Sequence, residues 1–431
     1  MRLLIIGSGP GGYETAVEAV KRGMEVTLIT EGPLGGTCLN EGCIPTKTFC
    51  HYAELIEQNL KAGMDCKPQF SVVADRKQTV IEQLRGGIEM LLKNVQVVYG
   101  KARFKDSRTV VCGDVEYSAD KIIIATGSQS ASLAVPGAES CLTSRDVLEL
   151  KEVPGSLCVI GGGVIGLEFA SIFRSFGSEV TVLEFCPNIL PRFDTDLAKR
   201  LKQTLSRRGI NIELQAQVTR IENGIVTYVK KELEFTVQAD KVLMAVGRRP
   251  NTDGLNLEAA GIEYTRKGIT VNDNYETSVP GIYAVGDVTG GIMLAHAATY
   301  QGVRALNAIC GQTDSIRFDL IPAAVFTIPE VATVGLTEEQ CKEQSLDVRC
   351  LKSFYRANGK AVSMDETDGY CKLIMGNDGK ILGSHILGAH ASDLIHEIAA
   401  VMNLDGTLNQ LQSVIHAHPT LSEVLQAAMN N

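Results

Sequence analysis

The sequence lacks a long apolar run, an excess of basic residues and any Cys-x-x-Cys pair. A membrane-spanning helix needs about 18 or more apolar residues in succession, so no such span is expected. The formal net charge of -9 argues against non-specific binding to nucleic acid, which needs a basic surface. Without Cys-x-x-Cys spacing, a zinc site among the 12 cysteines is not expected. We therefore expect no membrane, nucleic acid or metal as a partner, and a cytoplasmic location.

The composition is that of an ordinary globular protein. With 431 residues, of which 45% are hydrophobic and 21% charged, the chain is long enough for roughly three domains. A core of this size needs no disulfide to stay folded. Apart from Cys38 and Cys43, we expect the cysteines to be buried or half-buried small side chains. The apolar start MRLLII runs into a glycine loop rather than a cleavage site and reads as a first β-strand.

The strongest pattern is an internal repeat. LLIIGSGPGG (3–12) and CVIGGGVIGL (158–167) each join an apolar run to glycines at G-x-G-x-x-G spacing, and a helical pattern follows. The glycines are Gly7, Gly9 and Gly12 in the first copy and Gly161, Gly163 and Gly166 in the second. Each helix leads to a second strand and then to an acid, Glu31 or Glu184. This is the dinucleotide-binding fingerprint: the glycines permit a tight turn and close approach to a pyrophosphate, and the acid binds ribose hydroxyls.

Two such repeats predict an α/β fold with two Rossmann-like dinucleotide-binding domains. Further apolar strands run into glycine turns at 121–127 and 241–251, and GIYAVGD ends in Asp287. An acid at the carboxyl end of such a strand lies where open α/β sheets bind ligands, although Asp287 could equally cap the helix that begins near Leu294. From about Phe318 the pattern becomes that of a separate α+β domain. It has a hairpin around Asp378-Gly379 and helices at about 391–404 and 421–429.

Residues 35–47, GGTCLNEGCIPTK, place Cys38 and Cys43 five positions apart. In a regular helix their Cα atoms would be about 8.7 Å apart, whereas a disulfide needs roughly 4.4–6.8 Å. A bridge therefore requires a distorted turn, which Gly42 and Pro45 favour, and strained disulfides are the readily reduced kind. Lys47 lies one turn beyond Cys43 and favours the thiolate, the nucleophilic form. Two ordinary thiols beside a solvated lysine are the alternative, and the two fingerprints favour a redox pair.

These motifs together resemble the flavin-dependent pyridine nucleotide-disulfide oxidoreductases. The thiol segment, the two fingerprints, the ATG and GRRPN loops and the AVGD strand end occur in that family's order and cover essentially the whole chain. The resemblance implies a homodimer with shared active sites and a C-terminal α+β dimerisation domain. The implied domains are an FAD-binding domain at 1–149, an NAD-binding domain at 150–271, a central segment completing the FAD site at 272–317, and the dimerisation domain at 318–431.

The resemblance also implies roles for individual residues. Cys38 would be the thiol that meets the substrate and Cys43 the thiol that faces the flavin, with Lys47 near the flavin and paired with Glu168. The residues implied to bind FAD are Gly7, Gly9, Gly12, Glu31, Lys47, Gly100, Thr126, Gly127, Asp287, Met293, Leu294, Ala295 and His296. Those implied to bind NAD are Gly161, Gly163, Gly166, Glu184 and Gly247. Glu31 departs from the pattern, because Thr30 stands in the register that Glu184 occupies.

The segment HAHPTLSE (416–423) supplies a candidate base. A histidine suits proton transfer to or from a thiol near neutral pH. The resemblance makes His418 the general base, acting on the disulfide of the other subunit, and Glu423 the carboxylate that orients it. Taken alone, His418 could be a surface histidine in a helix-capping segment. His416 receives no role.

The acid of the second fingerprint bears on the choice of nicotinamide. A carboxylate at Glu184 accepts hydrogen bonds from a free 2′-hydroxyl and repels a 2′-phosphate, and no arginine stands beside it. NAD is therefore expected rather than NADP. The resemblance is to members that oxidise dihydrolipoyl groups on the lipoyl domains of a 2-oxoacid dehydrogenase or glycine cleavage complex. A glutathione-reductase-like enzyme and a non-catalytic, NADH-responsive flavoprotein subunit are the alternatives.

Overall fold

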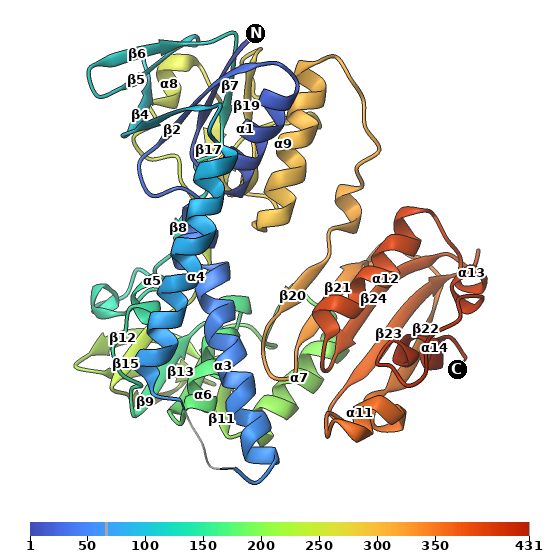
Figure 1. The fold of residues 1–431 in the computed structure, drawn as a ribbon. Coiled ribbons are helices and arrows are strands. Elements are labelled where there is room, and N and C mark those ends of the chain that lie inside the picture. The colour runs from blue at the N-terminus through green and yellow to red at the C-terminus, as the bar shows by residue number, and fades with distance from the viewer. Residues whose placement is uncertain (65–67, 431) are drawn as a thin grey trace. The chain divides into compact units, whose positions relative to one another are not determined.

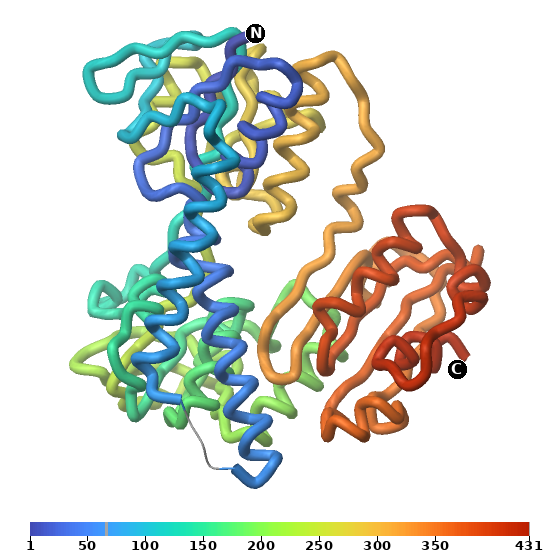
Figure 2. The backbone as a smooth tube through the Cα atoms, in the orientation of Figure 1, coloured from blue at the N-terminus to red at the C-terminus, as the bar shows by residue number. Residues whose placement is uncertain are grey.

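The structure is a computed structural model that describes residues 1–64 and 68–430. The chain forms two compact units, each assembled from separate stretches of sequence, as the colours along the tube in Figure 2 show. The first unit comprises Met1–Thr48, Val72–Ala131 and Gly247–Ile316, and the second comprises Phe49–Ser71, Ser132–Val246 and Arg317–Asn431. Two long helices, α3 (Cys43–Lys61) and α4 (Phe70–Leu91), each contain residues that belong to both units.

The first unit is built on a parallel sheet in the order β19-β7-β1-β2-β3 (Figure 1). Its strands are β1 (Arg2–Ile6), β2 (Glu25–Thr30), β3 (Gln96–Tyr99), β7 (Lys121–Ile124) and β19 (Ile282–Ala284). These segments form strands because leucine and β-branched residues follow one another with little polar interruption, which is the pattern of a parallel sheet buried on both faces. The predicted strands at the N-terminus, at 121–127 and at 281–287 are confirmed.

Alternate side chains of β1 enter different cores. Leu3 and Ile5 pack among residues of α1 (Pro10–Lys21) and α9 (Ala295–Ile309). Leu4 and Ile6 point to the opposite face and pack in the cluster that contains Phe104. Further elements of this unit are α2 (Gly36–Glu41), β4 (Ala102–Phe104), β5 (Thr109–Cys112), β6 (Val115–Ser118), β8 (Ser128–Ser130), β16 (Arg248–Pro250), α8 (Leu257–Ala260), β17 (Tyr264–Thr265) and β18 (Gly268–Ile269).

The second unit contains another parallel sheet, in the order β11-β10-β9-β15. The strands are β9 (Ser156–Ile160), β10 (Glu179–Glu184), β11 (Ile210–Leu214) and β15 (Lys241–Met244). Helix α6 (Val164–Phe176) follows β9 in the way that α1 follows β1, so the repeat seen in the sequence is also a structural repeat. Beside this sheet lie β12 (Gln217–Glu222), β13 (Ile225–Lys230), β14 (Leu233–Gln238), α5 (Ser144–Leu148) and α7 (Thr195–Arg207).

The C-terminal part of the second unit is an antiparallel sheet in the order β20-β21-β24-β23-β22 (Figure 1). Its elements are β20 (Ala323–Val325), β21 (Val331–Gly335), α10 (Glu338–Glu343), β22 (Val348–Phe354), α11 (Gly359–Ser363), β23 (Tyr370–Gly376), β24 (Ile381–Leu387), α12 (Ala391–Asn403), α13 (Leu408–Gln412) and α14 (Glu423–Met429). The predicted hairpin is β23–β24, and the two predicted helices are α12 and α14. Helices α12 and α14 share one apolar core with the sheet.

A buried ion pair ties α7 to this C-terminal sheet. Lys372 on β23 is 1% exposed, and its Nζ lies 2.8 Å from Asp194 and 2.6 Å from Glu338. Asp194 also caps α7, accepting a hydrogen bond from the Leu197 N–H at 3.3 Å. A buried ammonium needs such partners because its desolvation is costly. Lys372 thus joins the C-terminal sheet to Asp194 at the start of α7 and to Glu338 at the start of α10.

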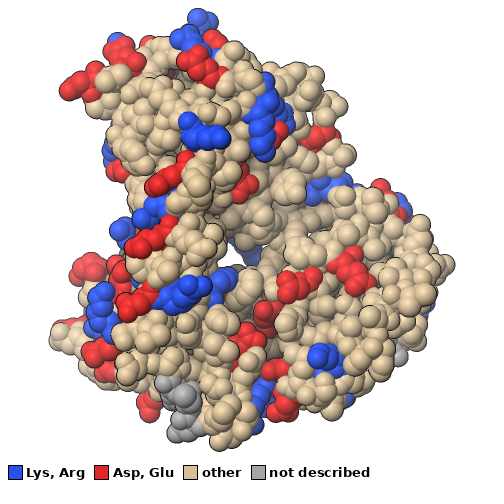
Figure 3. All heavy atoms as spheres, in the orientation of Figure 1, with Lys and Arg blue, Asp and Glu red and all other residues tan. Residues whose placement is uncertain are grey.

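In the ranges that the structure describes, no helix is long and apolar enough to cross a bilayer. On the face drawn in Figure 3, Lys and Arg side chains are interspersed with Asp and Glu.

The cysteines outside the thiol pair are mostly buried or half-buried, as expected. They are Cys50, Cys112, Cys141, Cys158, Cys186, Cys341, Cys350 and Cys371. Cys310 is exposed, contrary to expectation, because it forms the C-cap of α9 where the chain turns into solvent. Cys66 lies outside the described residues.

Candidate active site

The two glycine turns have nearly the same backbone geometry. Gly7 has φ +106° and Gly161 has φ +112°, a region that suits glycine. A β-carbon on the third glycine of each turn, Gly12 or Gly166, would overlap the carbonyl oxygen of the first. Each helix therefore packs directly on the strand that precedes it, as the fingerprint requires.

The middle glycine of each turn faces open space. A β-carbon on Gly9 or Gly163 would meet no heavy atom within 4 Å. Both residues are helix N-caps, and no side chain caps α1 or α6. Each turn thus leaves open space at its middle glycine and uncapped N–H groups at the positive end of a helix, which fits a pyrophosphate. The open space and the uncapped N–H groups at both turns are what binding the pyrophosphate of a dinucleotide requires.

The two acids that follow the turns differ in their surroundings. Glu184, at the end of β10, is buried and accepts hydrogen bonds from the N–H groups of Gly162 at 2.5 Å and Cys186 at 2.7 Å. In the first copy the same register is held by Thr30, whose hydroxyl lies 2.7 Å from that of Ser8. Glu31 is exposed. Its contact with an FAD ribose stays a prediction.

Asp287 is held by two residues that the sequence analysis did not single out. Ser128 donates its hydroxyl to Asp287 at 2.5 Å, and Arg248 donates to the hydroxyl and to the carbonyl of Ser128, each at 2.7 Å. Asp287 therefore does not cap the following helix, which has Leu294 as its N-cap. Ser128 directly follows the ATG motif and Arg248 is the second residue of GRRPN, so these motifs are the signal in the sequence that points to both residues.

Other predicted FAD residues lie around the same sheet edge. Thr126 donates its hydroxyl to Asn251 at 2.8 Å, and Gly127 accepts from the Asn251 N–H at 2.9 Å. The Gly100 N–H donates to Thr30 at 2.8 Å, just beyond β2. Met293, Leu294, Ala295 and His296 form the uncapped start of α9. Their roles as FAD contacts stay predictions. Gly247 belongs to the first unit, whereas the other predicted NAD residues belong to the second.

The thiol segment contains the predicted distortion. Helix α2 ends at Glu41, and α3 begins at Cys43, with the break at Gly42 (φ −143°, ψ −111°). Thr46 closes the first turn of α3, donating its N–H and its hydroxyl to the Gly42 carbonyl at 3.0 and 2.6 Å. Cys38 and Cys43 lie on either side of this break, where the chain is free of the regular helical spacing.

The two thiols are in hydrogen-bonding contact. The pKa of Cys38 is raised, first by its hydrogen bond to Cys43 and then by burial, while the charge of Lys47 acts in the opposite direction. Cys38 therefore holds its proton more firmly than an ordinary thiol does. A thiolate at Cys43 beside a protonated Cys38 is the arrangement that a reduced redox pair needs.

Helix α2 is seated on the first glycine turn. The Gly35 N–H donates to the Ser8 carbonyl at 3.0 Å. At its other end, Asn40 donates to the carbonyl of Gly36 at 2.8 Å and accepts from Arg85 of α4 at 2.5 Å. The thiol pair is thus held beside the first dinucleotide turn by backbone and side-chain contacts within one unit.

The predicted partner of Lys47 lies in the other unit. Lys47 is on the first turns of α3, in the first unit, and Glu168 is on α6, in the second. Glu168 is 4% exposed and accepts a hydrogen bond from the Phe326 N–H at 3.0 Å. The Lys47–Glu168 ion pair stays a prediction.

The predicted base and its orienter are in contact. Nδ1 of His418 lies 2.9 Å from Oε1 of Glu423, and 79% of the His418 side chain is exposed. The pKa of Glu423 is lowered, first by the N–H of Thr420, which donates to the carboxylate at 2.9 Å, and then by His418. An ionised Glu423 holds the proton of the neutral ring on Nδ1 and leaves Nε2 as the basic nitrogen.

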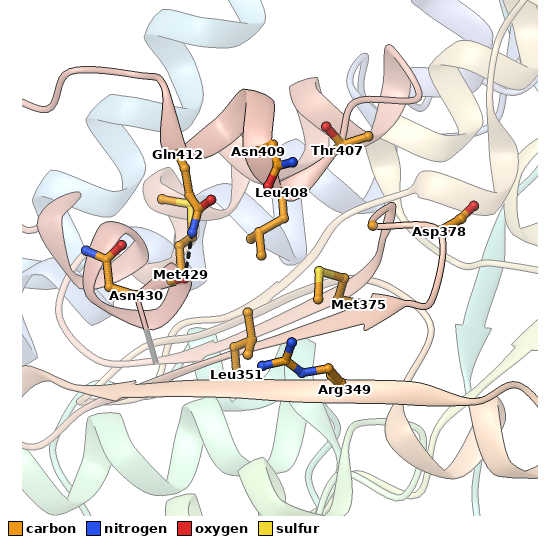
Figure 4. A pocket seen from close by; sticks show the side chains of 11 residues that line it. Arg349, Leu351, Met375, Asp378, Thr407, Leu408, Asn409, Gln412, Met429 and Asn430 are labelled. Atoms are coloured by element: carbon orange, nitrogen blue, oxygen red, sulfur yellow. Dashed lines mark hydrogen bonds between the residues drawn. The ribbon is translucent and has the colours of Figure 1, made fainter.

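A hollow of about 450 Å³ in the C-terminal sheet domain contains none of the predicted site residues. Leu351 and Met375 line it from the sheet, Leu408 faces them from the opposite side, and Arg349 lies beside Leu351 on β22 (Figure 4). Gln412 at its rim donates to the Met429 carbonyl at 2.8 Å. Among the described residues, no group of three or more His, Cys, Asp or Glu side chains could hold a metal ion.

Comparisons with known proteins agree with this geometry. Residues 1–302 match the family model described as pyridine nucleotide-disulphide oxidoreductase, and residues 321–429 match the dimerisation domain of the same family. A dihydrolipoyl dehydrogenase of Bacillus subtilis is 39% identical, over 100% of this chain and 98% of its own. A second from that organism is 42% identical, over 99% of this chain and 95% of its own.

Two solved structures share the fold. The HOCl-induced flavoprotein disulfide reductase RclA from Escherichia coli superposes with a TM-score of 0.90 at 33% identity, covering 100% of this chain and 99% of its own. LpdA from Mycobacterium tuberculosis superposes with a TM-score of 0.91 at 30% identity, with the same coverage.

Proposed function

The chain belongs to the pyridine nucleotide-disulphide oxidoreductase family, and we propose that it oxidises protein-bound dihydrolipoyl groups to lipoyl groups with NAD⁺ as the electron acceptor. It is an oxidoreductase acting on sulfur, with FAD and NAD as its cofactors and a homodimeric assembly. The observation that carries the proposal is the hydrogen-bonded pair Cys38–Cys43, seated against the first glycine turn.

The residues present fit both cofactors. We assign FAD to the first turn, Gly7, Gly9 and Gly12, with Asp287 accepting hydroxyl groups beyond it, and NAD to the second turn with Glu184. Although Glu184 already accepts two N–H groups, its oxygens retain lone pairs for a ribose hydroxyl. Bound FAD supplies the redox relay that returns the reduced thiol pair to its disulfide while NAD⁺ becomes NADH.

The chemistry of the chain's own residues is thiol–disulfide exchange. His418 takes the proton of one substrate thiol, and the resulting thiolate attacks the Cys38 sulfur of the Cys38–Cys43 disulfide, releasing Cys43 as a thiolate. The second substrate thiol then attacks the substrate sulfur of this mixed disulfide, which forms the lipoyl disulfide and breaks the bond to Cys38. Cys38 leaves as a thiol by taking the proton of this second substrate thiol, while His418 keeps the first proton. One dithiol is oxidised and one disulfide reduced, and Lys47 stabilises the thiolate that forms.

We extend the proposal to the partners. The substrate is carried by the lipoyl domains of a 2-oxoacid dehydrogenase or glycine cleavage complex, and the enzyme acts in the cytoplasm. His418 of one subunit serves the thiol pair of the other, so each active site is complete only in the dimer. The support for this is the 79% exposure of His418, which its own unit leaves open to a second chain.

A substrate panel tests the function. The FAD-loaded dimer is assayed with dihydrolipoamide and NAD⁺, and in the reverse direction with glutathione disulfide or CoA disulfide and either NADH or NADPH. We expect turnover with dihydrolipoamide and NAD⁺ to exceed the others by a large factor. Faster reduction of glutathione disulfide with NADPH would support the glutathione-reductase-like alternative. Bound flavin and NADH without any turnover would support the non-catalytic one.

A further inference from the structure

In the loop that carries His418, the side chain of one residue, His416, is buried. It connects α13 to α14, and within residues 413–419 every residue is exposed except His416. Val414 is 44% exposed and Ile415 is 95% exposed. The side chain of His416 is only 4% exposed. His416 is therefore the residue of this loop whose side chain is buried against the domain, so the way it is held contributes to the position of the loop.

His416 is held by a single polar contact. Its Nε2 lies 2.8 Å from Oε1 of Glu397. Its Nδ1 is buried and has no hydrogen-bond partner. An apolar side chain of similar size would fill the space without leaving a buried nitrogen unpaired, which is unfavourable. The directional contact to Glu397, rather than packing, is therefore what an imidazole contributes at this position.

Glu397 lies on a helix that is packed into the core of its domain, so its carboxylate has a well-defined position. Helix α12 buries Ala391, Ile395, Ile398 and Met402 in the core of the C-terminal sheet domain. Glu397 lies on the partly exposed side of this helix, where its carboxylate reaches the loop. The contact thus ties the base-carrying loop to a helix that is packed along its length.

Glu423 and Glu397 control different properties of the base. Glu423 contacts the His418 ring and fixes its tautomer and rotation. It does not fix the backbone of the residues before His418. The Val414 N–H donates to the Leu411 carbonyl at 3.1 Å, and two residues later the His416–Glu397 contact joins the described loop to α12.

We propose that Glu397 and His416 form a positioning pair that fixes the loop and therefore the place from which His418 exchanges its proton. This inference rests on the proposed function of His418 as the base. Neither residue touches the substrate in this account. Their effect passes through the backbone to a side chain two residues away, where a displacement of about 1 Å lowers a rate by about a hundredfold.

The test separates the base-dependent reaction from one that does not need the base. Glu397→Leu removes the acceptor, and we expect it to lower dihydrolipoamide oxidation about tenfold to a hundredfold. Electron transfer from NADH to ferricyanide through the bound flavin needs no thiol proton, so that rate should stay unchanged. Glu397→Gln keeps an oxygen acceptor for Nε2–H and should restore most of the dithiol activity. Asp393→Asn, on the same helix and 84% exposed at its side chain, is the matched control.

A double mutant identifies the route of the effect. If the pair acts only through His418, then Glu397→Leu added to His418→Gln should cause no further loss. Additive losses would overturn the proposal, and so would equal losses of the dithiol and ferricyanide reactions, since these would indicate a general structural role. An active Glu397→Leu beside an inactive His418→Gln would overturn the positioning pair and leave the proposed function intact. A fully active His418→Gln would instead overturn the assignment of the base, and this inference with it.

Discussion

Gly36, the first residue of α2, lies against Gly9 of the first glycine turn. A β-carbon on Gly36 would come within 2.6 Å of the Gly9 Cα and 3.0 Å of its nitrogen. The helix that carries Cys38 and the turn assigned to the FAD pyrophosphate are therefore one packed element. The redox pair and the dinucleotide site are connected by direct backbone contact, not only by their order in the sequence.

We predict that Gly36→Ala displaces both the thiol pair and the flavin. Gly36 has φ +58°, so the added methyl group is both strained and in collision with backbone. We expect unfolding stability to fall by about 1–3 kcal/mol and the bound flavin per subunit to decrease. Gly32→Ala is the control, because a β-carbon there meets nothing within 4 Å. Equal flavin content and equal melting temperature in the two variants would contradict the prediction.

Replacing Lys47 tests the electrostatics of the thiol pair. Its positive charge lowers the pKa of Cys38, so removing that charge leaves the raising effects of the hydrogen bond and burial unopposed. In Lys47→Met the pair should ionise at a higher pH than in the unchanged protein. When the rate of thiol alkylation in the reduced protein is measured against pH, the midpoint of that curve should move to higher pH. Lys61→Met, at the far end of α3, should leave the curve in place. A downward shift in Lys47→Met would show that the charge does not act on these thiols.

Glu184 is predicted to select the nicotinamide. Glu184→Gln removes the negative charge that repels a 2′-phosphate while keeping the size of the side chain. We expect the ratio of kcat/KM for NADH over NADPH to fall about tenfold or more, which corresponds to about 1.4 kcal/mol of discrimination. Glu179→Gln, at the exposed start of the same strand, is the matched control. An unchanged ratio in Glu184→Gln would place the selecting residue elsewhere.

Ser128 is predicted to support flavin binding through Asp287. Ser128→Ala removes the hydroxyl that donates to the carboxylate and accepts from Arg248. A hydrogen bond to a charged group contributes about 1.5–3 kcal/mol, so the Kd for FAD should rise about tenfold or more. Ser130→Ala in the same strand should bind FAD as the unchanged protein does. Equal Kd values for the two variants would remove Ser128 from the site.

Much of the fold was predictable from local patterns. The two glycine turns, the strand that ends in Glu184, the strand that leads to Asp287, and the break between Cys38 and Cys43 all follow from residue types at fixed spacing. These features depend on short-range geometry, which a sequence displays directly.

Other features depend on contacts between distant segments. Arg85 reaches Asn40 from another helix, and Arg248 reaches Ser128 across 120 positions of sequence. No spacing rule brings such pairs together. His416 is a third case, because only the packed structure shows that its ring turns inward while that of His418 is exposed. The supporting contacts of the site therefore had to come from the structure.

The central claim is that electrons pass from an external dithiol through Cys38 and Cys43 to NAD⁺. The most direct test is NADH formation from dihydrolipoamide and NAD⁺, measured for the FAD-loaded protein and for Cys43→Ser side by side. We predict steady NADH formation by the unchanged protein and none by the variant, which keeps its bound flavin. Turnover by Cys43→Ser at the rate of the unchanged protein would contradict the claim.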